Sequence, residues 1–428
     1  MPQDTSAFDS VLKDVYGDGI IEAISTKTKV LDMFERKPAS DYGGREVTYP
    51  VHVGRNEGSG WYSELGNLPS AGRQKHVPWH IPMKYMAGRV AFSTQVMKLS
   101  QGGQNAFAPA MRLEMDGLIK DMSANRGRSA LSDGRGVLAL QNGSAAAALP
   151  VDSPGGVAGA TNGGRFFNEG MIVGFVNPST GALRASSVRT VQSINSTGTT
   201  VTLDSSPTNG TDNDYIVRIA QTGSTDVADS SYAKEFTGLL AHVDDGTYMS
   251  TYHGINRTTY PLLQSTVITN VGALSQDVLQ RAIDIVDQTS EGEISDLIMH
   301  HSVRRAYIAV DLDHRRYMGQ DASKMDIGTV AAKKGSLTFG GIPIMEERYC
   351  PYGMIFGLDR SGLRRFVEVN GEWMQEDGSI LQRIGTGTTM QDAYEAVYRI
   401  WDEPHNDYPN RCFRLEGVSA TVAVTHVY

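Results

Sequence analysis

Residues 46–53 read EVTYPVHV and residues 79–85 read WHIPMKY, and both runs alternate apolar with polar side chains. A period of two is typical of a β-strand that has one covered face. Between the runs lie residues rich in Gly, Ser, Asn and Pro, which also include Trp61 and Tyr62. Residues 45–98 therefore predict a long two-stranded excursion with a broad tip. Such a ribbon is marginally stable alone in water and needs a neighbour to lie on.

The segments on either side of this excursion follow the helical period. Residues 8–36 carry apolar side chains at helical spacing with glycine interruptions, which predicts two short helices or a bent arm. Residues 105–133 place Met115 and Met122 on one stripe, with Pro109 in a first turn where proline is tolerated. At ~1.5 Å per residue this helix is about 40 Å long. We expect a structural spine whose methionines pack in a core.

The remainder of the chain predicts a β insertion and then an α/β region. Residues 134–164 are rich in Ala, Gly, Ser and Pro and predict a long irregular connection. Residues 165–220 alternate in short runs between turn sequences, which predicts an all-β module of about five strands. Ser275 is a candidate N-cap for a further helix, followed by a buried strand at 296–300 and a helix near Ser302.

The last third reads mainly as strands. Residues 337–384 predict strands with Gly and Pro turns, residues 393–401 fit either a short helix or a strand, and the final VSATVAVTHVY predicts a strand. The mixture indicates an α+β fold.

Charge and cysteine content exclude several classes of protein. In 428 residues, 39 Lys and Arg face 48 Asp and Glu, a net charge of −9, so binding to phosphate backbones by bulk charge is not expected. The start has no secretion pattern and no run approaches ~18 apolar residues, so we expect neither export nor a membrane span. Cys350 and Cys412 are too few for a disulfide framework, which fits a reducing cytoplasm.

The sequence offers no catalytic, cofactor or metal motif. A Walker A loop, a GxGxxG fingerprint and a GxSxG elbow are all missing. The pair His300 and His301 and the group Asp311, Asp313 and His314 have no strong ligand spacing. The second group lies among arginines and fits a solvated ion-pair cluster. We expect no catalytic residue, no cofactor and no metal, and hence no enzyme.

The order of the segments resembles the major capsid protein of tailed bacteriophages, which has the Hong Kong 97-type fold. The arm SVLKDVYGDGIIEAI, the excursion and the spine helix follow the order of that family. The run SDLIMHHSVRRAYIAVDLDHRRY resembles its central strand and helix, and GGIPIMEERYCPYGMIFGLDRSGLRRF resembles its strand–turn–strand motif. FNEGMIVGFVNPSTG looks like the opening of a β insertion found in some members.

The resemblance implies a domain order and a set of partners. The implied parts are an N-terminal arm (1–44), an extended β loop (45–98), a peripheral domain with the spine helix (99–164), an inserted β module (165–220), a connection (221–260), a central α/β domain (261–395) and returning strands (396–428). The family's prototype begins with a charged scaffolding region, whereas this chain starts almost at the arm, so a separate scaffolding protein is implied. The prototype also joins subunits through a Lys to Asn bond, but nothing marks Lys75 or Lys84 as reactive.

The function implied by the resemblance is a self-assembling shell subunit. It would form pentamers and hexamers of an icosahedral virion head, assembled in the host bacterial cytoplasm, with a portal and decoration proteins as further partners. The head would enclose double-stranded DNA without sequence-specific binding. The alternatives are an encapsulin-like nanocompartment shell and a cytoplasmic β-rich glycan-binding protein or enzyme. The expected subunit-interface residues lie on the excursion: Val47, Tyr49, Val51, Trp61, Trp79, Ile81, Met83 and Tyr85.

Overall fold

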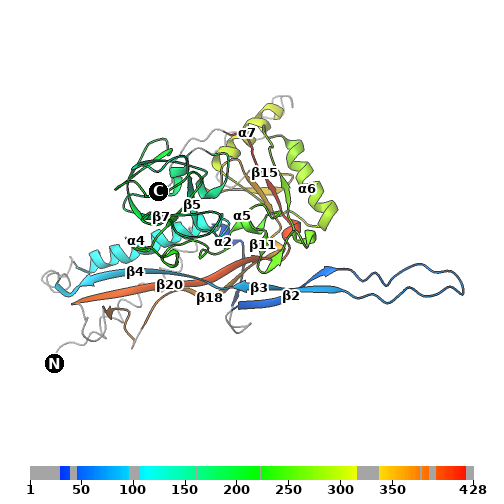
Figure 1. Cartoon of the computed structure of the whole chain (residues 1–428). Coiled ribbons are helices and arrows are strands. Elements are labelled where there is room, and N and C mark those ends of the chain that lie inside the picture. Colours follow the sequence, from blue (N-terminus) through cyan, green and yellow to red (C-terminus); the bar gives the residue numbers. More distant parts are fainter. Residues whose placement is uncertain are drawn as a thin grey trace.

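The computed structural model describes most of the chain. The described ranges are residues 29–38, 46–95, 107–160, 162–221, 223–315, 337–375, 378–384 and 392–420. Figure 1 shows two lobes above a long sheet, with a hairpin that extends away from one side of the molecule. No described helix is long and apolar enough to span a membrane. The expected C-terminal strand lies largely outside the described residues.

The spine helix α4 (Phe107–Ser129) lies along a five-stranded sheet. The sheet has the order β1-β18-β20-β19, and β4 pairs with β20. The strand bounds are β1 (Glu35–Pro38), β4 (Lys84–Ser93), β18 (Leu363–Trp373), β19 (Gln382–Arg383) and β20 (Ala393–Asn406). The expected helix at 105–133 is confirmed, with Pro109 in its first turn. The open choice at residues 393–401 is settled as a strand, because this segment pairs along its whole length with β4.

The methionine stripe of α4 is core, as expected. Met115 and Met122 are buried in a cluster that includes Ala396, Tyr398 and Ile400 of β20. A Cβ atom at Gly88 of β4 would lie 2.5 Å from the Sδ of Met122. The helix can therefore approach the sheet this closely only because β4 has no side chain at that position.

A buried ion group joins the end of the spine to the sheet. Arg126 of α4 donates from its two terminal nitrogens to Asp402, at 3.0 and 2.7 Å, and Arg365 of β18 donates from Nε at 2.6 Å. Burial alone would raise the pKa of Asp402, but the two guanidinium groups outweigh it and lower that pKa. The carboxylate is thus ionised and shared by three elements.

The inserted β module is a closed barrel that begins earlier than expected. Its strand order is β10-β5-β6-β9-β8-β7. The bounds are β5 (Val137–Gln141), β6 (Ala148–Asp152), β7 (Ile172–Val176), β8 (Arg189–Ile194), β9 (Thr200–Leu203) and β10 (Tyr215–Arg218). The expectation of an irregular connection over 134–164 is wrong for β5 and β6. Leu149 and Val151 of β6 point into the barrel core and alternate with exposed Ala148 and Pro150. The alanines and glycines around the strand hide this two-residue period in the sequence.

The other lobe is built on a six-stranded sheet of order β13-β21-β17-β14-β16-β15. The bounds are β13 (Thr266–Ile268), β14 (Asp296–Met299), β15 (Thr338–Phe339), β16 (Ile342–Glu346), β17 (Ile355–Leu358) and β21 (Phe413–Leu415), with helices α6 (Gln276–Ser290) and α7 (His301–Arg315). The expected cap is confirmed, since the Ser275 hydroxyl accepts from the Val278 amide at 3.3 Å. The expected strand and following helix are confirmed as β14 and α7.

Short helices, strands and turns connect the larger elements. They are α2 (Lys29–Asp32), α5 (Leu239–His242), β11 (Thr251–Tyr252), β12 (Ile255–Asn256) and 3-10 turns at Pro154–Gly156, Gly163–Phe166, Val227–Asp229, Pro261–Leu263, Arg360–Gly362 and Pro409–Arg411. Cys350 and Cys412 belong to the central core cluster and are both free thiols.

Candidate assembly surface

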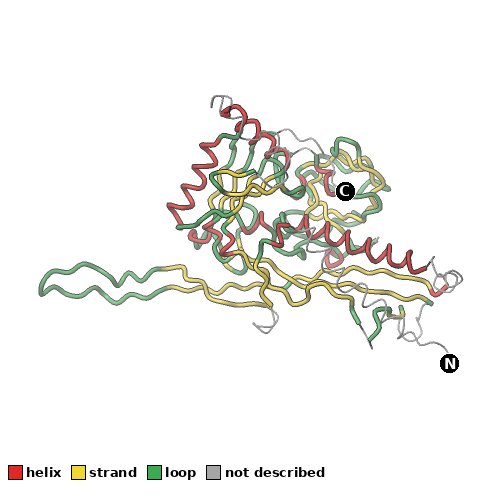
Figure 2. The backbone as a smooth tube through the Cα atoms, turned by 180° about the vertical axis from the view of Figure 1, so that it is seen from behind, coloured by secondary structure: helices red, strands yellow, loops and turns green. Residues whose placement is uncertain are grey.

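The excursion is a hairpin of β2 (Glu46–Gly54) and β3 (Lys75–Pro82). The two strands pair antiparallel, and the register sets Val47 against Ile81, Tyr49 against Trp79, and Pro50 against Pro78. Residues 55–74 form the tip and contain no strand. Both views show the tip extending well beyond the rest of the molecule (Figures 1 and 2).

The base of the hairpin is covered by the chain's own body. Trp79 is 1% exposed, and Val47 and Ile81 are buried beside it. Body residues from distant parts of the sequence complete the cluster: Tyr252, Ile255, Leu263 and Phe366. The hairpin β11–β12 and strand β18 thus supply the apolar surface that the ribbon lacks.

Aromatic and polar contacts fix the base in one orientation. The ring of Trp79 meets Tyr252 and His405 edge-on, with centroids 5.4 and 5.1 Å apart. The Tyr49 hydroxyl donates to the Asp407 carboxylate. The His80 amide donates to the carbonyl of His253 at 2.9 Å. These contacts are directional, so the ribbon leaves the body at a defined angle.

A group of buried titratable side chains lies under this base. The Tyr252 hydroxyl lies 2.7 Å from Nδ1 of His242 and 3.2 Å from Nδ1 of His405, and it accepts the Asn406 amide at 2.9 Å. Burial lowers the pKa of His242 and of His405 well below the ordinary value, and lowers that of His253 to about 3. These imidazoles are therefore neutral at pH 7.

Glu403 belongs to the same buried group. Its Oε1 accepts the Thr237 amide at 3.1 Å and lies 3.9 Å from Nε2 of His253. Burial raises the pKa of Glu403 to about 8. The carboxyl is thus mostly protonated at pH 7, which removes the cost of an unpaired buried charge.

The structure corrects part of the expected interface. Val47, Trp79, Ile81 and Met83 need no second molecule to cover them, because they are buried within the chain itself. Tyr49 and Val51 are partly buried against the same cluster. Side chains of the body that are remote in sequence cover this face, and no local pattern could reveal them. The role in a subunit interface stays a prediction for Tyr49 and Val51 and for the two exposed members, Trp61 and Tyr85.

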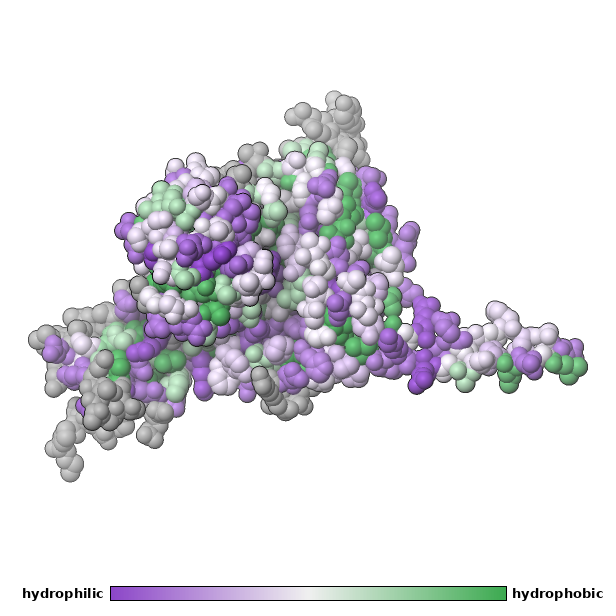
Figure 3. Space-filling view, viewed as in Figure 1, coloured by the Kyte–Doolittle hydropathy of each residue, from purple (hydrophilic) through white to green (hydrophobic). Residues whose placement is uncertain are grey.

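The tip is where apolar side chains meet solvent. Trp61 and Leu65 are fully exposed, Leu68 is 73% exposed and Tyr62 is 63% exposed. Figure 3 shows apolar surface at the far end of the hairpin, separated from the body by a polar stretch. Leu65 and Leu68 were not among the expected interface residues. The available signal was two leucines inside a segment otherwise rich in Gly, Ser and Asn.

Tyr85 occupies a different place from the tip. It lies on β4, is 60% exposed, and meets Trp401 of β20 edge-on with ring centroids 5.2 Å apart. Its ring therefore belongs to the outer face of the long sheet.

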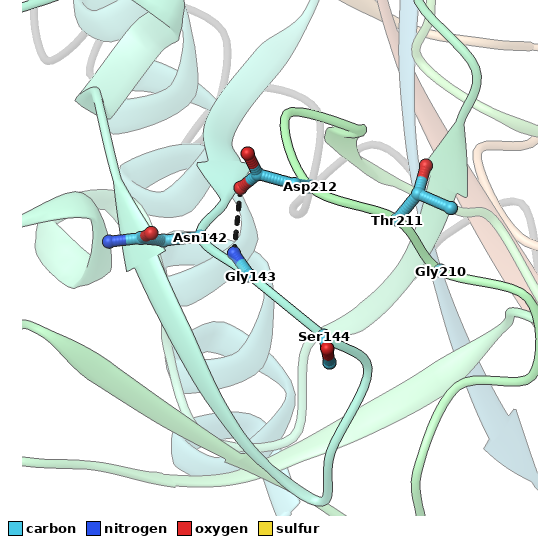
Figure 4. Close-up of a pocket in the computed structure, with 6 residues that line it drawn as sticks. All are labelled: Asn142, Gly143, Ser144, Gly210, Thr211 and Asp212. Carbon is cyan, nitrogen blue, oxygen red and sulfur yellow. Dashed lines mark hydrogen bonds between the residues drawn. The ribbon is translucent and has the colours of Figure 1, made fainter.

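The barrel carries a pocket of about 410 Å³. Two turns line it, with residues Asn142, Gly143, Ser144, Gly210, Thr211 and Asp212, and the Asp212 carboxylate accepts the Gly143 amide at 2.7 Å (Figure 4). The one ionisable group of this lining is thus already used to hold the two turns together. Across the described ranges, no group of three or more His, Cys, Asp or Glu side chains could hold a metal ion.

Comparisons with known proteins give similarities of shape. No protein-family model and no curated protein matches this chain. A chain of the cyanophage A-1(L) capsid is 11% identical, over 92% of this chain and 93% of that chain, with a TM-score of 0.48. A chain of Gordonia phage Cozz is 10% identical, over 92% and 87%, with a TM-score of 0.45. The SrpI encapsulin of Synechococcus elongatus is 10% identical, over 94% and 91%, with a TM-score of 0.41.

Capsid and encapsulin chains are thus among the solved structures to which this chain is similar in shape. With identities of 11% or less and TM-scores below 0.5, these similarities by themselves assign neither a family nor a function to this chain.

Proposed function

We propose that this chain is a shell subunit, the major capsid protein of a tailed bacteriophage, which assembles into pentamers and hexamers of an icosahedral head around double-stranded DNA. The observation that carries the proposal is the hairpin: its base is fixed in the chain's own core while its tip presents exposed Trp61, Tyr62, Leu65 and Leu68. An anchored, projecting apolar patch is typical of a surface that another protein covers.

A second copy of the same chain is the simplest partner for the tip. The tip carries Arg55 and Arg73 against Glu57 and Glu64, so its formal net charge is zero and apolar contact would dominate its docking. A tip that docks on a different surface of the next copy makes a heterologous contact, and such contacts close into rings when the rotation allows. Rings of five and six are what an icosahedral shell requires.

The remaining parts of the chain fit a structural role. The spine α4 is locked to the long sheet through the Arg126–Asp402–Arg365 group, and the barrel forms a separate lobe with its own core. On this proposal a separate scaffolding protein, a portal and decoration proteins are further partners, and the virion is the site of action. The division into arm, extended loop, peripheral domain, β module and central domain is part of the proposal.

The test removes the apolar tip without touching the base. A double variant, Trp61→Ser with Leu65→Ser, should fold normally because both side chains are exposed. Two such side chains contribute about 1.5–3 kcal/mol each when buried, and every 1.4 kcal/mol is about tenfold in affinity. We therefore expect the concentration needed for assembly to rise by more than about tenfold, as measured by sedimentation and negative-stain microscopy.

The matched control is Leu262→Ser, because Leu262 is 61% exposed but lies outside the hairpin. Assembly of this control should equal that of the unaltered chain. Normal particles from the tip double variant would contradict the proposal. The contents of particles from the native source, DNA or a protein cargo, decide between a virion head and an encapsulin-like compartment.

A further inference from the structure

Two histidines face each other at the point where the hairpin opens into its tip. His52 of β2 and His76 of β3 are direct partners in the register, and their ring centroids are 5.2 Å apart with the planes tilted by 46°. Both residues are exposed, on the face of the ribbon opposite to Trp79. The register shifts between His52 and Gly54, so His52 and His76 form the last regularly spaced pair before the tip.

The separation of the two rings is the one that a shared metal ion requires. A zinc–nitrogen bond is about 2.0–2.1 Å, and a ring centre lies about 1.1 Å beyond its nitrogen, so each ring centre would be about 3.2 Å from the metal. At a tetrahedral angle of about 109°, two such ring centres are about 5.2 Å apart. The observed centroid separation of 5.2 Å equals this value.

No competing interaction holds either ring among the described residues. The nearest lysine, Lys75, places its ammonium group over the ring of Tyr260, 4.9 Å from the centroid, and so is directed to another partner. His80, on the same face, is different: its Nδ1 lies 3.1 Å from the Glu46 carboxylate and it is opposite Thr48. The hairpin thus has one exposed cross-strand pair of histidines, His52 with His76, and one exposed histidine, His80, that faces a threonine.

We propose that His52 and His76 form a two-ligand site for a divalent transition-metal ion of the zinc, nickel or copper class, with water in the remaining positions. Imidazole nitrogen suits these ions, whereas magnesium and calcium prefer oxygen. The bound ion bridges β2 and β3 where they separate. It therefore fixes the fork from which the tip, residues 55–74, departs. The site lies within one subunit and does not depend on the proposed shell assembly.

Isothermal titration of the full chain with Zn²⁺ tests the site. We expect one ion per chain, and an affinity lower by about tenfold or more in His52→Ala and in His76→Ala, because each loses one of two ligands. Both side chains are exposed, so circular dichroism should show folded variants. His80→Ala is the matched control and should bind within about twofold of the unaltered chain. Magnesium should give no binding.

A second measurement follows the fork itself. Arg55 and Arg73 are exposed trypsin sites on either side of the tip. Zinc should slow cleavage at both sites in the unaltered chain and in His80→Ala, but not in the double variant His52→Ala with His76→Ala. The proposal would be overturned if the double variant bound zinc as tightly as the unaltered chain, or if His80→Ala lost as much affinity as the double variant. In either case the ion would lie elsewhere. The proposal would also be overturned if zinc slowed trypsin cleavage of the double variant as much as that of the unaltered chain.

Discussion

The base and the tip of the hairpin belong to one ribbon but have opposite relations to the rest of the chain. At the base, Trp79 is buried by body residues, whereas Trp61 at the tip is fully exposed. The cause is distance, since the strands lie over the body and residues 55–74 extend past it (Figure 2). The comparison teaches that an alternating apolar face indicates a covered strand without indicating which molecule covers it.

The same substitution at the two tryptophans should have very different costs. Trp79→Ala removes a buried ring packed on Tyr252 and His405 and should lower the free energy of unfolding by about 3–5 kcal/mol. Trp61→Ala should change it by less than about 0.5 kcal/mol. Urea unfolding of the unassembled chain measures both. Equal costs would mean that base and tip do not differ as described.

Acidification should weaken the base. His242, His253 and His405 have pKa values lowered by burial. Below the ordinary value of about 6.5 the unfolded chain therefore binds protons that the folded chain does not. Their stabilisation is present above about pH 6.5 and is lost as the pH falls toward the folded values, by up to about 1.4 kcal/mol per pH unit for each histidine.

Glu403 acts in the opposite direction. Its pKa is raised to about 8. Its contribution to the stability of the fold is therefore fully present below about pH 4.5 and is lost as the pH rises through about 8. Three histidines outweigh one carboxyl between about pH 4.5 and 6.5, and unfolding measured against pH should show stability falling on acidification. His253→Gln should flatten that slope and Trp61→Ala should leave it unchanged. An unchanged slope in His253→Gln would show that the buried group is not its source.

The smallest contrast concerns two tyrosines. Tyr49→Phe removes the hydroxyl that donates to Asp407 at the base. Asp407 keeps Arg364 at 2.7 Å, so the carboxylate is not left unpaired and the cost should be only about 1 kcal/mol. Tyr62→Phe at the tip should cost nothing measurable. Thermal unfolding of the two variants measures the loss of stability in each. A loss for Tyr62→Phe at least as large as that for Tyr49→Phe would contradict this difference between tip and base.

Much of the fold follows from local patterns in the sequence. The spine α4, the capped start of α6 at Ser275 and the strand β14 could be predicted because period and capping are local properties. Strands β5 and β6 could not, because small residues around Leu149 and Val151 hide their alternation. The ion group on Asp402 was also beyond prediction, since it joins residues separated by as many as 276 positions.

The candidate surface was predicted in outline and corrected in detail. The existence and apolar face of the hairpin are visible in its period of two, although its second strand ends at Pro82 and not near residue 98. Trp61 is exposed at the tip, and its role in an interface stays a prediction. The residues that cover the base come from β11, β12 and β18. Their position depends on the tertiary fold, so the sequence pattern could not show that the chain's own body covers Val47, Trp79 and Ile81.

The facing prolines of the hairpin, Pro50 and Pro78, affect how separate copies of the chain can meet. A two-stranded ribbon has two open edges, and an open edge is a template on which strands of other chains can add. Proline has no amide hydrogen to donate, so each edge is interrupted at the same level. Strand-by-strand addition of one hairpin to another is thereby hindered at these positions, so that contacts between hairpins would be made by side chains.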